Sequence, residues 1–199
     1  MRNDYIVIGM ILLAAFTYNQ WRGQQEKFYP GAVVSSVPVQ KSVFNPKPFP
    51  FKKYTIHPFA EFEIKALVLS SQRYFWERGA ELVPVDLALG WGPMSDGDVL
   101  KDLSISQGNR WYMYHYQKPP IPISEIVSHS ANMHLIPSTD EVAKEIGRAH
   151  KGSVVEFKGY LVNVKAEDGF YWNSSQTRTD SGGGSCELVW VEEFKILDI

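Results

Sequence analysis

The segment SHSANMHLIP, residues 128–137, holds the side chains best suited to chemistry, His129 and His134. They are five residues apart, which leaves the two rings roughly 140° from a common face on a helix and on opposite faces of a regular strand. They therefore do not form a ready metal pair, unlike the i, i+4 histidines of a zinc-protease helix. Asn132 and His134, two residues apart, share one face of a strand. The favoured interpretation is an irregular wall segment whose polar side chains bond to the backbone.

Cys186 is the single cysteine of the chain, so an internal disulfide and a cysteine-rich zinc site are excluded. A thiol nucleophile needs a lowered pKa and a nearby base. If the chain is an enzyme, we expect Cys186 to be the nucleophile, with His134 or His129 as the base and Asn132 or Asp180 orienting it. No protease signature surrounds this cysteine. A thiol outside a disulfide more often behaves as a small buried hydrophobe, which is the favoured role here.

The polar loop QTRTDSGGGS, residues 176–185, is a candidate ligand-binding element. Arg178, together with glycine amides and Ser174 or Ser175, has the chemistry to hold a carboxylate or a phosphate. Alternatively, Arg178 and Asp180 form an ion pair that only shapes the loop. The loop is not a P-loop, because it lacks the Gly-Lys-Ser/Thr ending.

Trp91, within the run GWGP, is a further ligand-binding candidate. Its ring has the form of a stacking platform for a sugar or a peptide, although such a residue more often fills a core beneath a turn. Asp86, Asp96 and Asp98 could join a histidine at a hard-metal site, but turn and helix-cap roles explain them more simply. We therefore predict neither a metal nor a cofactor.

The elements that must position these side chains are mainly strands. Apolar residues at period two, or in short runs bounded by turn residues, predict strands over 61–74, 110–117, 153–166 and 186–197. Residues 138–150 read as a helix, because Ser138 and Glu141 have capping-box spacing and apolar residues recur on one face.

This order of elements predicts an α+β fold with a mainly antiparallel, curved sheet and one main helix. A small five-stranded barrel with a helix before its last hairpins is similar to an OB-fold, which binds extended ligands on one open face. We expect residues 60–199 to form this β-rich domain. Fold alone carries no function.

Residues 1–21 predict the location of the protein. The uncharged apolar run behind Arg2 is about 14 residues long, against the ~20 that span a bilayer, and Tyr5, Tyr18 and Trp21 suit the two interfaces. An uncleaved transmembrane signal anchor fits best. We expect a single-pass protein of the inner membrane whose C-terminal domain is extracytoplasmic, in the periplasm.

Residues 22–59 contain half of the chain's 12 prolines and are expected to form a linker. Proline disfavours helix, so the simplest interpretation is a semi-stiff extended spacer. The alternative is that Phe44, Phe49 and Phe51 dock onto the domain or a partner, because aromatic residues are unusual in a solvated tether.

The charge balance argues against nucleic acid as a partner. The formal net charge is −2 and the sequence pI is about 6.2, whereas a phosphate-binding protein normally carries a basic excess. We therefore expect an envelope protein, a glycan or a peptide as the ligand.

Five strings together resemble a family of uncharacterised bacterial membrane-anchored or exported proteins: VDLALGWGPMSD (85–96), ISQGNRWY (105–112), HSANMHLIP (129–137), GYLVNV (159–164) and SSQTRTDSGGGSCELVWV (174–191). The resemblance spans residues 62–191 and implies an extracytoplasmic or membrane-associated domain, without an activity. The leading hypothesis is therefore a membrane-anchored extracytoplasmic binding domain of unknown ligand. The alternative is a thiol- or metal-dependent hydrolase that uses Cys186 and His134.

Overall fold

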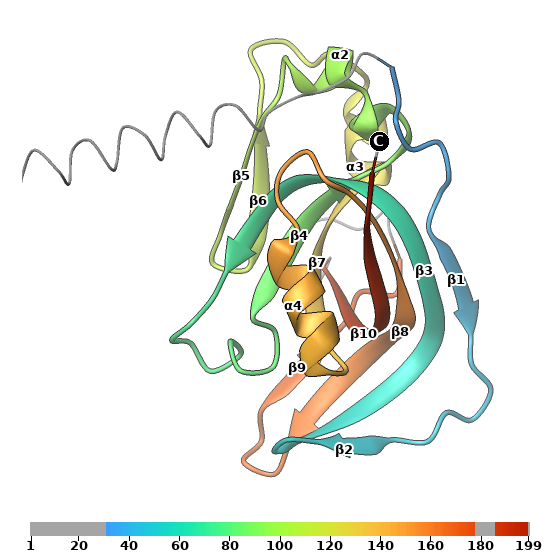
Figure 1. Cartoon of the computed structure of the whole chain (residues 1–199), viewed down its shortest axis with the longest axis vertical. Coiled ribbons are helices and arrows are strands. Elements are labelled where there is room, and N and C mark those ends of the chain that lie inside the picture. The colour runs from blue at the N-terminus through green and yellow to red at the C-terminus, as the bar shows by residue number, and fades with distance from the viewer. Residues whose placement is uncertain (1–30, 178–185, 199) are drawn as a thin grey trace, which may run out of the picture.

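The computed structural model describes residues 31–177 and 186–198 (Figure 1). Strands dominate this part of the chain, and the helices are short. The strands are β1 (Val39–Ser42), β2 (Phe49–Phe51), β3 (Tyr54–Arg73), β4 (Val85–Gly90), β5 (Ser104–Gly108), β6 (Trp111–His115), β7 (Ser130–Pro137), β8 (Val154–Ala166), β9 (Tyr171–Asn173) and β10 (Glu187–Leu197). The helices are the 3-10 turn η1 (Gly92–Ser95), α2 (Gly97–Leu100), α3 (Ile123–Ser128) and α4 (Asp140–Arg148).

Five strands form a ring in the order β3–β4–β7–β10–β8, which closes because β8 also pairs with β3. The pairs are antiparallel except for β7 with β10, which run parallel. β1 and β2 pair with β3, and β9 pairs with β8. The structure is thus the curved, mainly antiparallel sheet with few helices that is expected of the α+β class.

Two strands of the ring, β7 and β10, contribute apolar residues to cores on both of their faces. Phe62, Ile64 and Phe157 belong to the larger core cluster, together with Met133 and Leu135 of β7. A second cluster lies against the other side of the same strands and includes Ile136, Leu188 and Trp190. Because alternate residues of β7 and β10 enter different clusters, these strands are covered on both faces.

β7 corrects the prediction of an irregular wall segment. SANMHLIP is a regular central strand, and all eight of its residues are buried. A strand covered on both faces lacks the polar–apolar alternation by which a strand is recognised. The prediction that Asn132 and His134 share one face is confirmed, since both lie on this strand two residues apart.

The main helix begins one residue later than the capping box predicts. Thr139 is the N-cap of α4, and its hydroxyl accepts a hydrogen bond from the Val142 amide at 3.2 Å. Ser138 instead extends the contact with β10, because its amide donates to the Val191 carbonyl at 3.0 Å. α4 packs on β7 and β10 (Figure 1), and its own Ile146 side chain is buried.

Strands β1 and β2, and the first residues of β3, lie within the segment expected to be a linker. The rings of Phe49 and Phe51 meet the Trp190 ring edge-on, at centroid distances of 5.0 and 4.7 Å. Docking is therefore found for these two residues, whereas Phe44 is 98% exposed. β3 already begins at Tyr54, ahead of residue 60.

The expected membrane anchor, residues 1–21, lies outside the described residues. Within residues 31–177 and 186–198, no helix has both the length and the apolar character that a bilayer crossing requires.

The hairpin β5–β6 forms a separate two-stranded sheet. Asn109 and Arg110 connect its strands. Both have left-handed backbone, with φ angles of 51° and 67°, which is the pattern of a type I′ turn. Figure 1 shows the tip of the hairpin beside the end of β3. The tyrosines of β6 pack against the larger core, while Trp111 and Met113 on its other face are exposed.

Candidate functional site

The Arg110 side chain reaches from the hairpin tip into a polar site where β3 ends and β4 begins. Its Nη1 lies 2.7 Å from Asp86 Oδ1, and its Nη2 donates to the Val83 carbonyl at 2.9 Å. Its Nε donates to Glu77. The arginine side chain is only 14% exposed and that of Asp86 is fully buried. The hairpin tip is thus clamped to the ring by charge-assisted hydrogen bonds.

Two aromatic rings form the walls of the site. The Arg110 guanidinium carbon lies 3.6 Å from the ring centroid of Tyr74 and 5.3 Å from that of Trp172, so both rings contribute cation–π contacts. Gly79 allows this close packing, because a Cβ at that position would lie 2.9 Å from the Trp172 ring. The β3–β4 loop, β9 and the hairpin therefore converge on one guanidinium.

Asp86 also contacts His134 on the neighbouring strand. The two residues face each other in the β4–β7 register, and His134 Nδ1 lies 3.0 Å from Asp86 Oδ1. The Trp172 ring covers the imidazole at a centroid distance of 4.8 Å. Oδ1 of Asp86 thus accepts from Arg110 and lies beside His134, whereas Oδ2 of Asp86 and Nδ1 of His134 are buried and have no hydrogen-bond partner among the described residues.

Asn132 joins the hairpin to Cys186. Its amide nitrogen donates to the Arg110 carbonyl at 3.1 Å and lies 3.9 Å from the sulfur of Cys186. Its amide oxygen accepts from Gln107 at 2.6 Å, and the Cys186 thiol donates to the Arg110 carbonyl at 3.8 Å. The structure therefore places Asn132 beside Cys186, while the contacts of His134 described above run to Asp86 and Trp172.

His129 lies away from this site, as its spacing from His134 predicts. Its Nδ1 is 3.0 Å from the Glu125 carbonyl oxygen, and a Cβ on Gly92 would lie 2.8 Å from its ring. It follows α3 directly as the C-cap residue, so its role is local.

The remaining candidates that lie in the described residues, Ser174, Ser175 and Trp91, have structural roles. Ser174 accepts from the Leu188 amide at 3.0 Å, and the Ser175 amide donates to the Cys186 carbonyl at 2.9 Å, so both serines fasten the base of the polar loop. Arg178 and Asp180 lie outside the described residues. Trp91 is 1% exposed, in the larger core.

The acids considered for a metal site are dispersed. Asp96 is the N-cap of α2 and accepts from the Asp98 amide at 2.8 Å, which confirms its capping role, and Asp98 pairs with Lys101 at 3.0 Å. Asp86 lies on β4, at the site of Arg110. The described part of the chain contains no group of three or more metal-ligating side chains.

Sequence reasoning missed four side chains of the site, those of Tyr74, Glu77, Arg110 and Trp172. A signal was present in QGNRWY, where a two-residue type I′ turn favours Asn-Gly. This chain places Arg110 at the glycine position, with φ at 67°. A long side chain in left-handed backbone indicates that its head group is held by other contacts.

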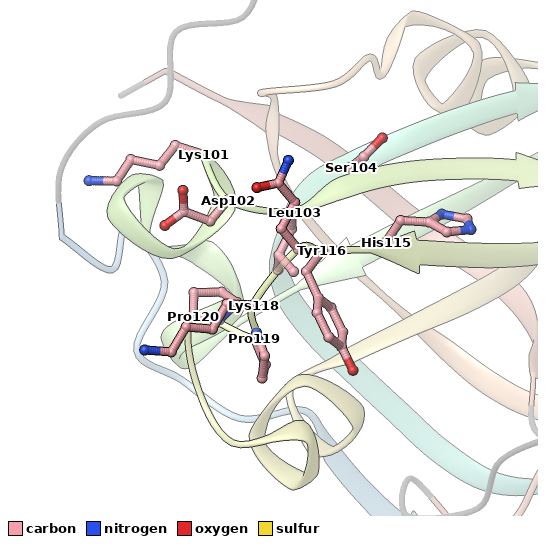
Figure 2. Close-up of a pocket in the computed structure, with 10 residues that line it drawn as sticks. Lys101, Asp102, Leu103, Ser104, His115, Tyr116, Lys118, Pro119 and Pro120 are labelled. Atoms are coloured by element: carbon pink, nitrogen blue, oxygen red, sulfur yellow. The ribbon is translucent and has the colours of Figure 1, made fainter.

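A separate open depression of about 810 Å³ lies at the base of the hairpin. It is lined by residues 101–104 and 115–120. Figure 2 shows the side chains of Lys101, Ser104 and His115 pointing in different directions. Because polar groups that converge on one point characterise ligand sites, we assign no site to this depression.

Burial raises the pKa of Tyr112 to about 12, and burial together with the nearby Asp86 charge raises the pKa of Tyr74 to about 12. In the unfolded chain both hydroxyls titrate near pH 10. We therefore expect the free energy of unfolding to be unaffected by these groups below pH 10 and to fall as the pH rises from about 10 to about 12. Absorbance titration near 295 nm checks this, since Tyr112→Phe should remove part of the late step. Loss of a step at pH 10 instead would contradict it.

Comparison with protein-family models, with curated proteins and with solved structures found no match to this chain. The family suggested by the five strings therefore stays a prediction.

Proposed function

We propose that this chain is a membrane-anchored extracytoplasmic binding domain that holds a peptide segment of an envelope protein on the outer side of β4 and β7. The order of strands in the ring, with α4 before the last two, resembles an OB-fold barrel. OB-folds bind extended ligands with their second and third strands and with the loops after the first and fourth strands. The corresponding parts here are β4, β7, the β3–β4 loop and the β8–β10 connection, which supply most of the residues around Arg110.

The observation that carries the proposal is the exposure of four large aromatic side chains next in sequence to the site, called the aromatic rim below. Each is the chain neighbour of Arg110 or of a residue that contacts it. Large aromatic residues dominate the energetics of recognition surfaces, and a cluster of them on the surface is a mark of a binding site. The four residues and their exposed fractions are Phe75 (71%), Trp76 (97%), Trp111 (41%) and Tyr171 (71%).

Charge at the site favours a peptide over a nucleic acid. The carboxylates of Asp86 and Glu77 lie at its centre, around the one guanidinium, and a phosphate backbone would be repelled by them. A peptide can instead bring apolar side chains to the aromatic rim and a cationic group to the acids.

A library of random peptides, screened against the full-length protein in detergent, tests the proposal. We expect a reproducible set of bound peptides whose affinity falls at least about tenfold in the Phe75→Ala/Trp76→Ala variant, as for a typical pair of hot-spot residues. Phe44→Ala is the matched control, since Phe44 is as exposed as Trp76 but follows β1 and is not next in sequence to any residue that contacts Arg110. Equal binding by all three proteins, or ligands found only among glycans, would refute the peptide proposal.

A thiol hydrolase is the second candidate, because one observation favours it. His134 Nδ1 lies 3.0 Å from the Asp86 carboxylate without a hydrogen bond to it, and an acid beside a histidine is the pair that orients a catalytic base; His134 shares its side of β7 with Asn132, whose amide contacts Cys186. Alkylation by iodoacetamide tests this role without a known substrate. An activated thiol reacts well below pH 8 in the wild type and loses this reactivity in His134→Gln. A rate that rises only near pH 8.5 in both proteins rules the hydrolase out.

A further inference from the structure

We propose that the cavity filled by the Arg110 side chain is a guanidinium-recognition site, in which Arg110 is a built-in occupant that an arginine of the ligand replaces. This inference rests on the proposed function for its peptide and adds the chemistry that the peptide must carry. It also requires that the tip of the hairpin β5–β6, which carries Arg110, can move out of the site.

The lining of the cavity matches the chemistry of a guanidinium. Carboxylates of Asp86 and Glu77 and the Val83 carbonyl accept from three different nitrogens, and Tyr74 and Trp172 present their rings to the cation. A planar group with five donors suits this set of acceptors and aromatic faces better than an ammonium does. The site therefore selects arginine over lysine.

Arg110 leaves part of this recognition capacity unused. It contacts only Oδ1 of Asp86, an oxygen that also lies beside His134. Oδ2 of the same buried carboxylate has no hydrogen-bond partner among the described residues. A guanidinium that approached on another path could bind both oxygens in the bidentate geometry that carboxylates favour.

The built-in occupant is also held under strain. Arg110 has a φ of 67°, in the left-handed region that favours glycine. The hairpin that carries it is a sheet of its own and shares no ladder with the ring, and a two-stranded hairpin has little stability by itself. The hairpin tip can therefore withdraw the Arg110 side chain while the five-stranded ring keeps all of its pairings and the β6 tyrosines stay on the larger core.

Exchange of the two arginines then regulates binding. In the resting protein, Arg110 competes with the ligand, and the apparent affinity falls by the fraction of molecules in which the cavity is filled. A ligand succeeds only if it contributes further contacts, for which the exposed aromatic residues next in sequence to the site are available. Short arginine-containing segments without apolar neighbours are thereby excluded.

The first experiment empties the cavity with Arg110→Gly in the full-length protein in detergent. Glycine suits a φ of 67° and gives the Asn-Gly turn, so the hairpin connection is retained. We expect ethylguanidinium to raise the melting temperature of this variant with a saturable dependence on concentration, and ethylurea, its uncharged analogue, to have no such effect. If the variant folds only with an additive, recovery of folded protein with ethylguanidinium but not ethylurea is the readout.

Two controls make the result specific to the cavity. Asn109→Gly changes the same turn but leaves Arg110 in place, so neither it nor the wild type should respond to ethylguanidinium. Arg110→Gly/Asp86→Asn lacks the central carboxylate and should not respond either. Absence of a saturable response or of recovery in Arg110→Gly, or an equal response in the double variant, overturns the proposal.

The second experiment measures a capped Gly-Arg-Gly tripeptide. We expect it to bind Arg110→Gly at least about tenfold more tightly than the wild type, because the competing Arg110 side chain is gone. The Gly-Gln-Gly analogue should have the same affinity for both proteins. Equal tripeptide affinities overturn the exchange. Library peptides whose binding depends on the aromatic rim but that lack arginine would support the proposed function and overturn this inference. A response to ethylguanidinium without any rim-dependent peptide would support the guanidinium site and overturn the proposed function.

Discussion

Asp86→Ala is expected to lower the free energy of unfolding by about 3–5 kcal/mol, the range observed when one partner of a buried ion pair is removed. The substitution leaves the guanidinium of Arg110, whose side chain is only 14% exposed, beside Glu77 and a backbone carbonyl. It also removes the oxygen nearest to Nδ1 of His134. Urea denaturation followed by tryptophan fluorescence measures the loss, since Trp172 lies against the side chains of both Arg110 and His134.

Asp98→Ala is the matched control for this prediction. Asp98 pairs with Lys101 at the surface, where both side chains are more than half exposed, so its loss should be barely measurable. A double variant, Asp86→Leu/Arg110→Leu, should recover much of the stability, because it removes both charges together. If Asp86→Ala were no less stable than Asp98→Ala, the clamp between hairpin and ring would not depend on Asp86.

Gly159→Ala is expected to prevent folding, or to lower the free energy of unfolding by at least about 3 kcal/mol, at the upper end for overpacking. A Cβ at this position would lie 1.9 Å from the Trp190 carbonyl oxygen and 3.0 Å from its carbon. These are backbone atoms of β10, and Gly159 pairs with Val191 beside the register shift of that strand. Relief of the clash must therefore separate β8 from β10.

The yield of folded protein and its urea denaturation curve measure this effect. Gly108→Ala is the control, because a Cβ on Gly108 would meet no atom within 4 Å. We expect that variant to differ little from the wild type. A Gly159→Ala protein as stable as Gly108→Ala would mean that β8 and β10 can move apart at no cost.

The sequence predicts those elements whose burial is one-sided or whose ends carry turn signals. Strand β6 alternates between half-buried tyrosines and exposed side chains, and α4 has a cap and an apolar stripe, so both are found where the pattern indicates. β7 defeats the same reasoning, because both its faces are buried and its polar residues point into the protein. The capping residue of α4 differs by one position for a related reason: Ser138 is still engaged by β10.

The site is predictable only in part. The odd spacing of His129 and His134 correctly separates them, and the even spacing of Asn132 and His134 correctly joins them. Asp86 meets His134 through the β4–β7 register, which depends on a connection of about 40 residues between the two strands and leaves no trace in the local sequence. The Arg110 contacts arise in the same way, although the Asn-Arg turn marks the residue as unusual.

Closure of the ring by β3 and β8 has a consequence for how the molecule is made. β3 is near the start of the described chain and β8 is near its end, so their pairing must wait until most of the chain has been synthesised and must overcome a large loop-closure entropy. Until then, an edge of a 20-residue strand stays open to pairing with other chains. We therefore expect slow folding, and a requirement for chaperones that shield the early strands until the last ones arrive.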